Sequence, residues 1–121
     1  MGLFGNASVT DKDSTENNLS KILIDGESVQ LSYKLIRDKF VFTNKRLIII
    51  NVQGLSGSKT SYRSIPYRSI SRFSIETTGT FDIDAELKIW ISGQVEPSES
   101  YKFSGDNHIY DIQRALATAI L

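Results

Sequence analysis

Residues 40–54, with the sequence FVFTNKRLIIINVQG, constrain the fold of this chain more than any other stretch. Two apolar runs, residues 40–42 and 47–50, flank the polar tetrapeptide 43–46. β-Branched and aromatic residues favour strands, whereas Asn44 suits a turn and Lys45 and Arg46 are stable in water. The second run is apolar at four successive positions, which indicates a strand covered on both faces. We therefore predict a central β-hairpin with a solvated basic turn.

Five further strands are predicted around this hairpin, from alternating or short apolar runs at residues 29–35, 59–65, 69–77, 87–91 and 101–103. Pro66 cannot donate to a strand ladder, so the strand before it should end there or lie at an edge. After Gly105 the apolar period becomes helical, and the stripe consists of Ile109, Ile112, Leu116, Ala119 and Ile120. The predicted fold is mainly β: a barrel or orthogonal sandwich of seven antiparallel strands, capped by a C-terminal α-helix over residues 107–120.

Residues 1–27 are predicted to form a helical or flexible N-terminal extension to the β domain of residues 28–121. Asp13 and Glu16 have the spacing of a capping box, and Gly26 is placed to end a helix. Leu19 and Ile22 would lie on one face of that helix. A helix this short is unstable alone, so we expect its apolar face to pack against another surface.

Composition is typical of a globular protein of one domain, with 121 residues, 40% hydrophobic and 23% charged. The absence of cysteine excludes disulfides, thiol catalysis and Cys-ligated zinc. No apolar run has the length of a membrane span, and the N-terminus lacks the pattern of a secretory signal. These features favour a cytoplasmic location.

The charge is distributed unevenly although the formal net charge is zero. Residues 34–72 carry nine bases and one acid, whereas residues 73–121 carry eight acids and three bases. Residues 1–33 are also acidic, with five acids and two lysines. Overall neutrality argues against nucleic acid as a partner. A basic and an acidic flank match better head to tail than in an isologous dimer, and head-to-tail contacts can close into a ring.

The sequence contains no pattern of catalytic or metal-binding residues that would indicate a particular reaction. His108 is the only histidine, and its place beside Asp106 at a helix start indicates an exposed residue. Asp82, Asp84 and Glu86 alternate as in half of a calcium loop, but Gly93 stands where that loop needs a glutamate. We therefore predict no enzyme activity, no metal and no cofactor.

Four motifs resemble the bacterial pleckstrin-homology-like (PH-like) family. They are DKFVFTNKRLI at residues 38–48, QGLSGSK at 53–59, SIPYRSI at 64–70 and FDIDAELKIW at 81–90. The resemblance covers roughly residues 20–121 and implies the fold of eukaryotic PH domains with an N-terminal helical addition. It also implies ring-like homo-oligomers.

Two functions are predicted from these features. The first is a non-enzymatic scaffold that assembles with itself into a ring and binds a protein partner, which can be membrane-associated. Its candidate interface residues are Leu19, Ile22, Arg63, Arg72, Asp82, Asp84 and Trp90. The alternative is a peripheral module for anionic lipid headgroups. The similarity to eukaryotic PH domains implies Lys34, Arg37 and Lys39 as its headgroup-binding residues.

Trp90 has two interpretations, because it is out of phase with the apolar stripe of Leu87, Ile89 and Ile91. It either belongs to a second small core under the N-terminal segment or anchors an interface, where tryptophan is enriched.

Overall fold

The computed structural model describes residues 8–9, 12–35, 38–55, 57, 59–77, 85–103 and 108–121. The chain begins with the short strand β1 (Ser8–Val9) and helix α1 (Lys12–Asn18). A meander of four strands follows: β2 (Val29–Lys34), β3 (Asp38–Thr43), β4 (Arg46–Gln53) and β5 (Lys59–Pro66). The 3-10 turn η1 (Tyr67–Ser69) leads into β6 (Ile70–Thr77), β7 (Ala85–Ile91) and β8 (Glu99–Phe103), and helix α2 (His108–Ile120) comes last.

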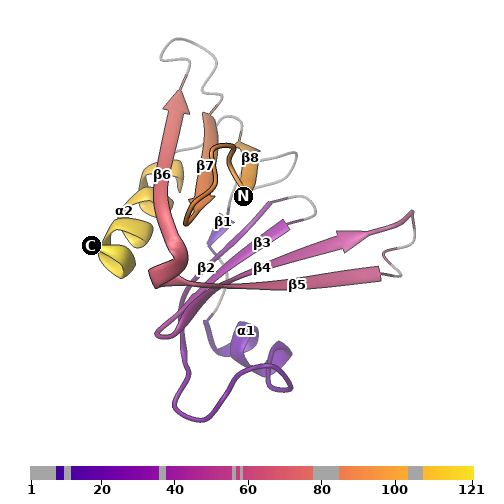
Figure 1. Ribbon diagram of the computed structural model, residues 1–121. Helices are drawn as coiled ribbons and strands as arrows, with labels where there is room; N and C mark the ends of the chain where they lie inside the picture. Colours follow the sequence, from indigo (N-terminus) through magenta and orange to yellow (C-terminus); the bar gives the residue numbers. More distant parts are fainter. Residues whose placement is uncertain are drawn as a thin grey trace.

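Two antiparallel sheets face each other (Figure 1). The first has the order β1-β2-β3-β4-β5, and the second the order β6-β7-β8. All seven predicted strands and the C-terminal helix are confirmed, with β1 as an unpredicted addition. Backbone hydrogen bonds do not join the sheets into a closed barrel in the described part of the chain, so the sandwich alternative is the correct one.

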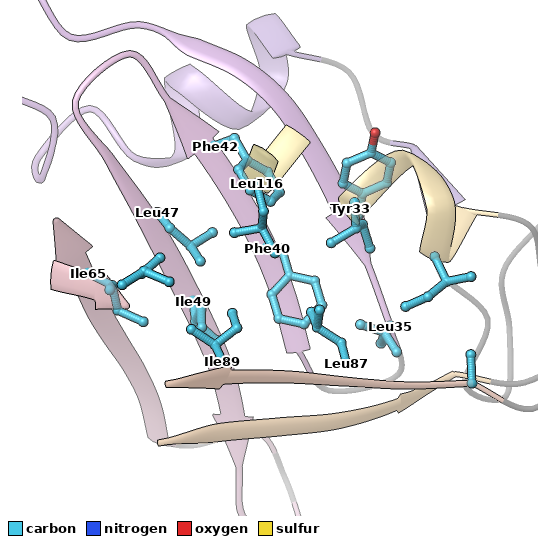
Figure 2. Close-up of a cluster of buried hydrophobic side chains, with 14 residues drawn as sticks. Tyr33, Leu35, Phe40, Phe42, Leu47, Ile49, Ile65, Leu87, Ile89 and Leu116 are labelled. Atoms are coloured by element: carbon cyan, nitrogen blue, oxygen red, sulfur yellow. The ribbon is translucent and has the colours of Figure 1, made fainter. Parts of the chain in front are cut away.

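The main core lies between the two sheets and α2 (Figure 2). Phe40 and Phe42 of β3, Leu47 and Ile49 of β4, and Leu87 and Ile89 of β7 point into it. Helix α2 closes this core with the three predicted residues Ile109, Ile112 and Leu116, which are all fully buried. The helical period of apolar residues after Gly105 therefore correctly identified the face of α2 that packs against the sheets.

A second core lies on the outer face of the first sheet, beneath the N-terminal segment (Figure 1). Leu19, Val29, Val41 and Ile48 are its buried members, with Ile22, Leu23 and Ile50 packed around them. Strand β4 thus sends Leu47 and Ile49 into one core and Ile48 into the other. The prediction that this strand is covered on both faces is confirmed.

The N-terminal helix is shorter than predicted: it ends at Asn18 and does not continue to Gly26. The predicted capping box is wrong. Asp13 lies inside the helix, and the Glu16 carboxylate accepts a hydrogen bond from the Val29 N–H at 2.6 Å. Gly26, with a φ of +80°, forms the turn into β2 rather than a helix cap. The Glu16 carboxylate therefore bonds to the backbone of β2 instead of to the start of its own helix.

The two sheets are linked by side chains where β5 approaches β8. Arg63 of β5 donates to Glu99 Oε1 and to the Tyr101 hydroxyl, both at 2.6 Å. The Tyr101 ring meets Phe40 of the first sheet edge to face, with centroids 4.9 Å apart. This cluster replaces the backbone pairing that a closed barrel would have.

Candidate functional site

The polar turn between β3 and β4 is a hydrogen-bonded junction rather than a solvated loop. The Thr43 hydroxyl is buried, accepts from the N–H groups of Lys45 and Arg46 at 3.0 Å each, and donates to Glu27 Oε2 at 2.6 Å. Asn44 reaches back to the N-terminal segment, accepting from Ser28 N and donating to the Gly26 carbonyl. The turn therefore ties residues 26–28 to the central hairpin.

Glu27 and Arg46 form a buried ion pair at this junction. Arg46 donates from Nε and Nη2 to the two carboxylate oxygens at 2.9 Å each, and from Nη2 to the Ile22 carbonyl at 3.0 Å. The Glu27 side chain is fully covered and that of Arg46 is 21% exposed. Bidentate pairing of this kind is the strong form of an ion pair. The interpretation of Arg46 as a solvated turn residue was wrong.

The pKa of Glu27 reflects two opposed effects. Burial raises it, but hydrogen bonds from Arg46, Thr43 and the Ile24 N–H outweigh burial and bring the pKa to about 2. Tyr67 completes the junction by donating its hydroxyl to the Thr43 carbonyl at 2.6 Å, and burial raises its own pKa. The side chains of Thr43, Asn44 and Arg46 in this motif thus have a structural role.

The predicted interface residues are dispersed over the molecule. Leu19 is only 2% exposed within its own chain, so it belongs to the second core and is corrected to a core residue. Ile22 is half-buried against the same core. Arg63 is exposed but engaged by Glu99 and Tyr101. Asp82 and Asp84 lie outside the described residues.

Trp90 lies on the outer face of the second sheet, opposite Arg72 of β6. The Arg72 guanidinium is 4.2 Å from the centroid of the indole ring, and the indole N–H donates to the Val95 carbonyl at 3.0 Å. Trp90 is therefore not part of the second core, which lies on the other sheet. Val95 beside it is 84% exposed, so an arginine, an indole and an apolar side chain share this part of the surface.

Two of the three predicted headgroup-binding residues lie side by side on the outer face of the first sheet. Lys34 of β2 is directly opposite Lys39 of β3. Neither forms an ion pair with an acid in the described part of the chain. Burial, and then the charge of Lys34, lower the pKa of Lys39. Arg37 lies outside the described residues.

Asp38 does not neutralise these lysines, although it precedes Lys39 in the sequence. Successive side chains of a strand point to opposite faces, and Asp38 accepts a hydrogen bond from the Asn51 amide at 2.5 Å. Ile50 and Tyr62 continue the row of Lys34 and Lys39 across β4 and β5. The outer face therefore presents two uncompensated cations next to half-buried and exposed apolar groups.

The outer edge of β5 is open among the strands that the structure describes. Arg46 is opposite Pro66, and its own N–H donates to Thr43, away from β5. That pair is therefore not hydrogen-bonded, as expected for a proline on an edge strand. Hydrogen-bonded and non-hydrogen-bonded pairs alternate in antiparallel sheets. The backbone groups of Thr60, Tyr62 and Ser64 consequently point outward.

A groove opens between α2 and the ends of β2 and β3, with a volume of about 480 Å³. One wall is a stripe of α2 made of Asp111, Arg114, Ala115, Thr118 and Ala119. The opposite side consists of Gln30, Leu31, Tyr33, Phe42, Thr43, Asn44 and Tyr67. Sequence analysis missed this groove, and Ala119, assigned to the core stripe, lies exposed along it.

Two sandwiched antiparallel sheets of four and three main strands with a closing C-terminal helix define a PH-like binding domain. Comparison with known proteins supports this class. A family model described as the bacterial PH domain matches residues 1–120, so the chain belongs to the bacterial PH domain family. The resemblance seen in the four sequence motifs is thereby confirmed.

Relatives and solved structures of similar length agree. The chain is 52% identical over 120 residues to the Bacillus subtilis protein YjqA, covering 99% of this chain and 96% of that protein. A crystal structure of a PH domain protein from Shewanella loihica is 47% identical with a TM-score of 0.84, and the match covers 97% and 99% of the two chains. A PH domain from Shewanella amazonensis is 51% identical, also with a TM-score of 0.84, covering 97% and 94%.

Two further properties concern the described residues only. No helix among them is long and apolar enough to cross a membrane. No group of three histidine, cysteine or acidic side chains among them is arranged to hold a metal ion.

Proposed function

We propose that this protein is a non-enzymatic PH-like scaffold that assembles with itself head to tail into a ring and binds a protein partner. The observation that carries the proposal is the open edge of β5, with outward backbone groups at Thr60, Tyr62 and Ser64. An unpaired edge strand is a ready template for another strand. Membership of a family of binding domains supports a function without catalysis.

A ring requires the edge of β5 to meet a different surface of the next copy. Pairing of β5 with β5 would be isologous and would stop at a dimer. The second sheet ends in β6 and β8, each paired only with β7 among the described strands, and these edges supply the heterologous partner surface. Strands β2 to β5 of the first sheet carry five bases and one acid. Acidic groups on the next copy would therefore favour its contact with this sheet.

Exchange of Tyr62 for proline tests the assembly. Tyr62→Pro removes one outward N–H without touching the pairing with β4, and it should weaken self-association at least tenfold. Tyr62→Thr is the matched control because it also removes the ring but keeps the N–H, and threonine is favourable in strands. Light scattering after size exclusion, at low and high salt, measures the assembled mass. A wild-type monomer at cellular concentration, or a dimer that never grows, would reject the ring.

Charge should contribute to assembly, which is expected to weaken as salt screens exposed pairs. Lys59→Glu is the suitable charge reversal, because Lys59 is exposed at the start of β5 and has no ion pair within the described residues. Arg63→Glu would break the bond to Glu99 inside one subunit and confuse the result. Assembly indifferent to salt and to Lys59→Glu would keep the ring but reject charge as its organiser.

Binding of anionic lipid headgroups is the second candidate, favoured by the adjacent Lys34 and Lys39. Two cations held opposite each other without an acid partner can share one phosphate. The double variant Lys34→Gln with Lys39→Gln should sediment severalfold less with phosphatidylserine vesicles than wild type. Lys45→Gln, at an exposed turn residue, is the control and should sediment like wild type. Equal sedimentation of the double variant, or equal binding to neutral phosphatidylcholine vesicles, would reject this function.

A further inference from the structure

The groove between α2 and β2 has no role in the assembly proposed above. It is an extension of the main core that the helix leaves unfilled, because the groove side of α2 carries Ala115, Thr118 and Ala119. Across from them, Tyr33 and Phe42 pack edge to face with centroids 6.3 Å apart, and Leu31 is 37% exposed. The groove therefore has an apolar floor that water reaches.

Most polar groups along the groove already have partners. Thr43, Asn44 and Tyr67 form the junction with the N-terminal segment. The Asp111 carboxylate is close enough to Tyr33 to raise, after the larger effect of burial, the pKa of that hydroxyl. Arg114 differs, because it is exposed, lines the groove and forms no ion pair with any described acid.

We propose that this groove binds an extended acidic peptide segment of the partner protein. A carboxylate of the peptide meets Arg114, and a neighbouring apolar side chain enters between Leu31 and Ala119. The α2 wall runs from Asp111 to Ala119, which is about 12 Å at the helical rise. An extended peptide of about four residues has that length, and the volume of about 480 Å³ is in the range of ligand sites.

The peptide assignment follows from charge and shape together. Arg114 is the sole cation of the lining and its planar fork suits a carboxylate. An apolar floor flanked by a strand on one side and a helix on the other accepts a chain with alternating side chains. The inference rests on the partner-binding half of the proposed function and is independent of the β5 edge.

An immobilised array of tetrapeptides tests the inference on the full-length protein. One position is Glu, Gln or Lys, and the other positions vary over Leu, Val, Phe and Ser. Wild-type protein should prefer Glu over Lys peptides by roughly tenfold. Arg114→Gln should lose that preference, with roughly fivefold weaker binding of the Glu peptides, or about 1 kcal/mol. Arg68→Gln, an exposed arginine outside the groove, should change nothing.

Ala119→Leu fills the groove from an exposed position and should reduce binding of all apolar peptides at least fivefold, while the thermal melt stays near that of wild type. Light scattering on the same samples should show unchanged assembly, so that loss of peptide binding and loss of the ring are told apart. No preference for Glu, or full binding by Ala119→Leu, would overturn the proposal. Binding of free decanoate as tight as that of the best peptide would make this a small-carboxylate site and would also overturn it.

Discussion

Replacement of Glu27 by alanine is expected to lower the free energy of unfolding by about 3–5 kcal/mol. The carboxylate accepts from Arg46, Thr43 and the Ile24 N–H, and its side chain is fully covered. Its removal leaves the Arg46 guanidinium, only 21% exposed, without its charge partner. The N-terminal segment should also loosen, because Arg46 holds the Ile22 carbonyl.

Urea unfolding at fixed protein concentration, so that assembly contributes equally, measures this effect. Asp25→Ala is the matched control, since Asp25 is an exposed acid two residues away and should change the free energy of unfolding by less than about 0.5 kcal/mol. A Glu27→Ala variant as stable as the control would show that the buried pair does not hold the segment.

The same carboxylate should make stability depend on acid. Its folded pKa of about 2 lies below the ordinary value of 4.5, so its contribution is fully present above pH 4.5 and is lost as the pH falls toward 2. The shift corresponds to about 3 kcal/mol. The difference in unfolding free energy between wild type and Glu27→Gln should therefore shrink through that window. A difference that stays constant down to pH 2 would contradict the lowered pKa.

Leu116→Asp is expected to destabilise the domain by several kcal/mol, because it puts an unpaired carboxylate into the main core. Leu116 is fully buried, with Ile112 on the preceding turn of α2 and Phe42 of the first sheet in the same core. Asp at this position would have to protonate or break the packing between α2 and the sheets. The thermal melting temperature should fall by well over 10 °C, if the variant folds at all.

Thr118→Asp provides the comparison for Leu116→Asp on the same helix. Thr118 is exposed, so its aspartate stays in water and should cost at most about 1 kcal/mol, mostly from repulsion by the C-terminal end of the helix dipole. Leu116→Ala tests the site without a charge and should cost about 2–5 kcal/mol through the cavity it leaves. A melt of Leu116→Asp equal to that of wild type would remove α2 from the core.

The proposed partner binding and the proposed assembly involve different parts of this architecture. The β5 edge offers backbone groups, the row of Lys34 and Lys39 offers charge, and the groove beside α2 offers an apolar floor with Arg114. The variants Tyr62→Pro, Lys34→Gln with Lys39→Gln, and Ala119→Leu therefore test the proposed assembly, the alternative of headgroup binding and the proposed peptide binding separately. The Glu27–Arg46 pair borders two of these surfaces, because Thr43, which donates to Glu27, lines the groove and Arg46 donates to the Ser64 hydroxyl of β5.

The amino-acid sequence by itself determined the order of strands, the two-sided burial of β4 and the packing face of α2. These features follow from local periodicity: alternation in a strand, a continuous apolar run in a strand between two layers, and the 3.6-residue stripe of Ile109, Ile112 and Leu116. Each of these features depends only on residues that are close together in the sequence. The four motifs that identified the family are local in the same way.

Only the tertiary structure decided what the polar and small residues do. Arg46 reads as a solvated turn residue until Glu27, 19 residues earlier in the chain, is brought beside it. Leu19 reads as a helical surface anchor until β3 and β4 supply Val41 and Ile48 to bury it. The groove depends on alanines of α2 standing opposite Leu31 of β2. Contacts between segments distant in sequence leave no local period, so burial, pairing and empty space at these positions were set by packing.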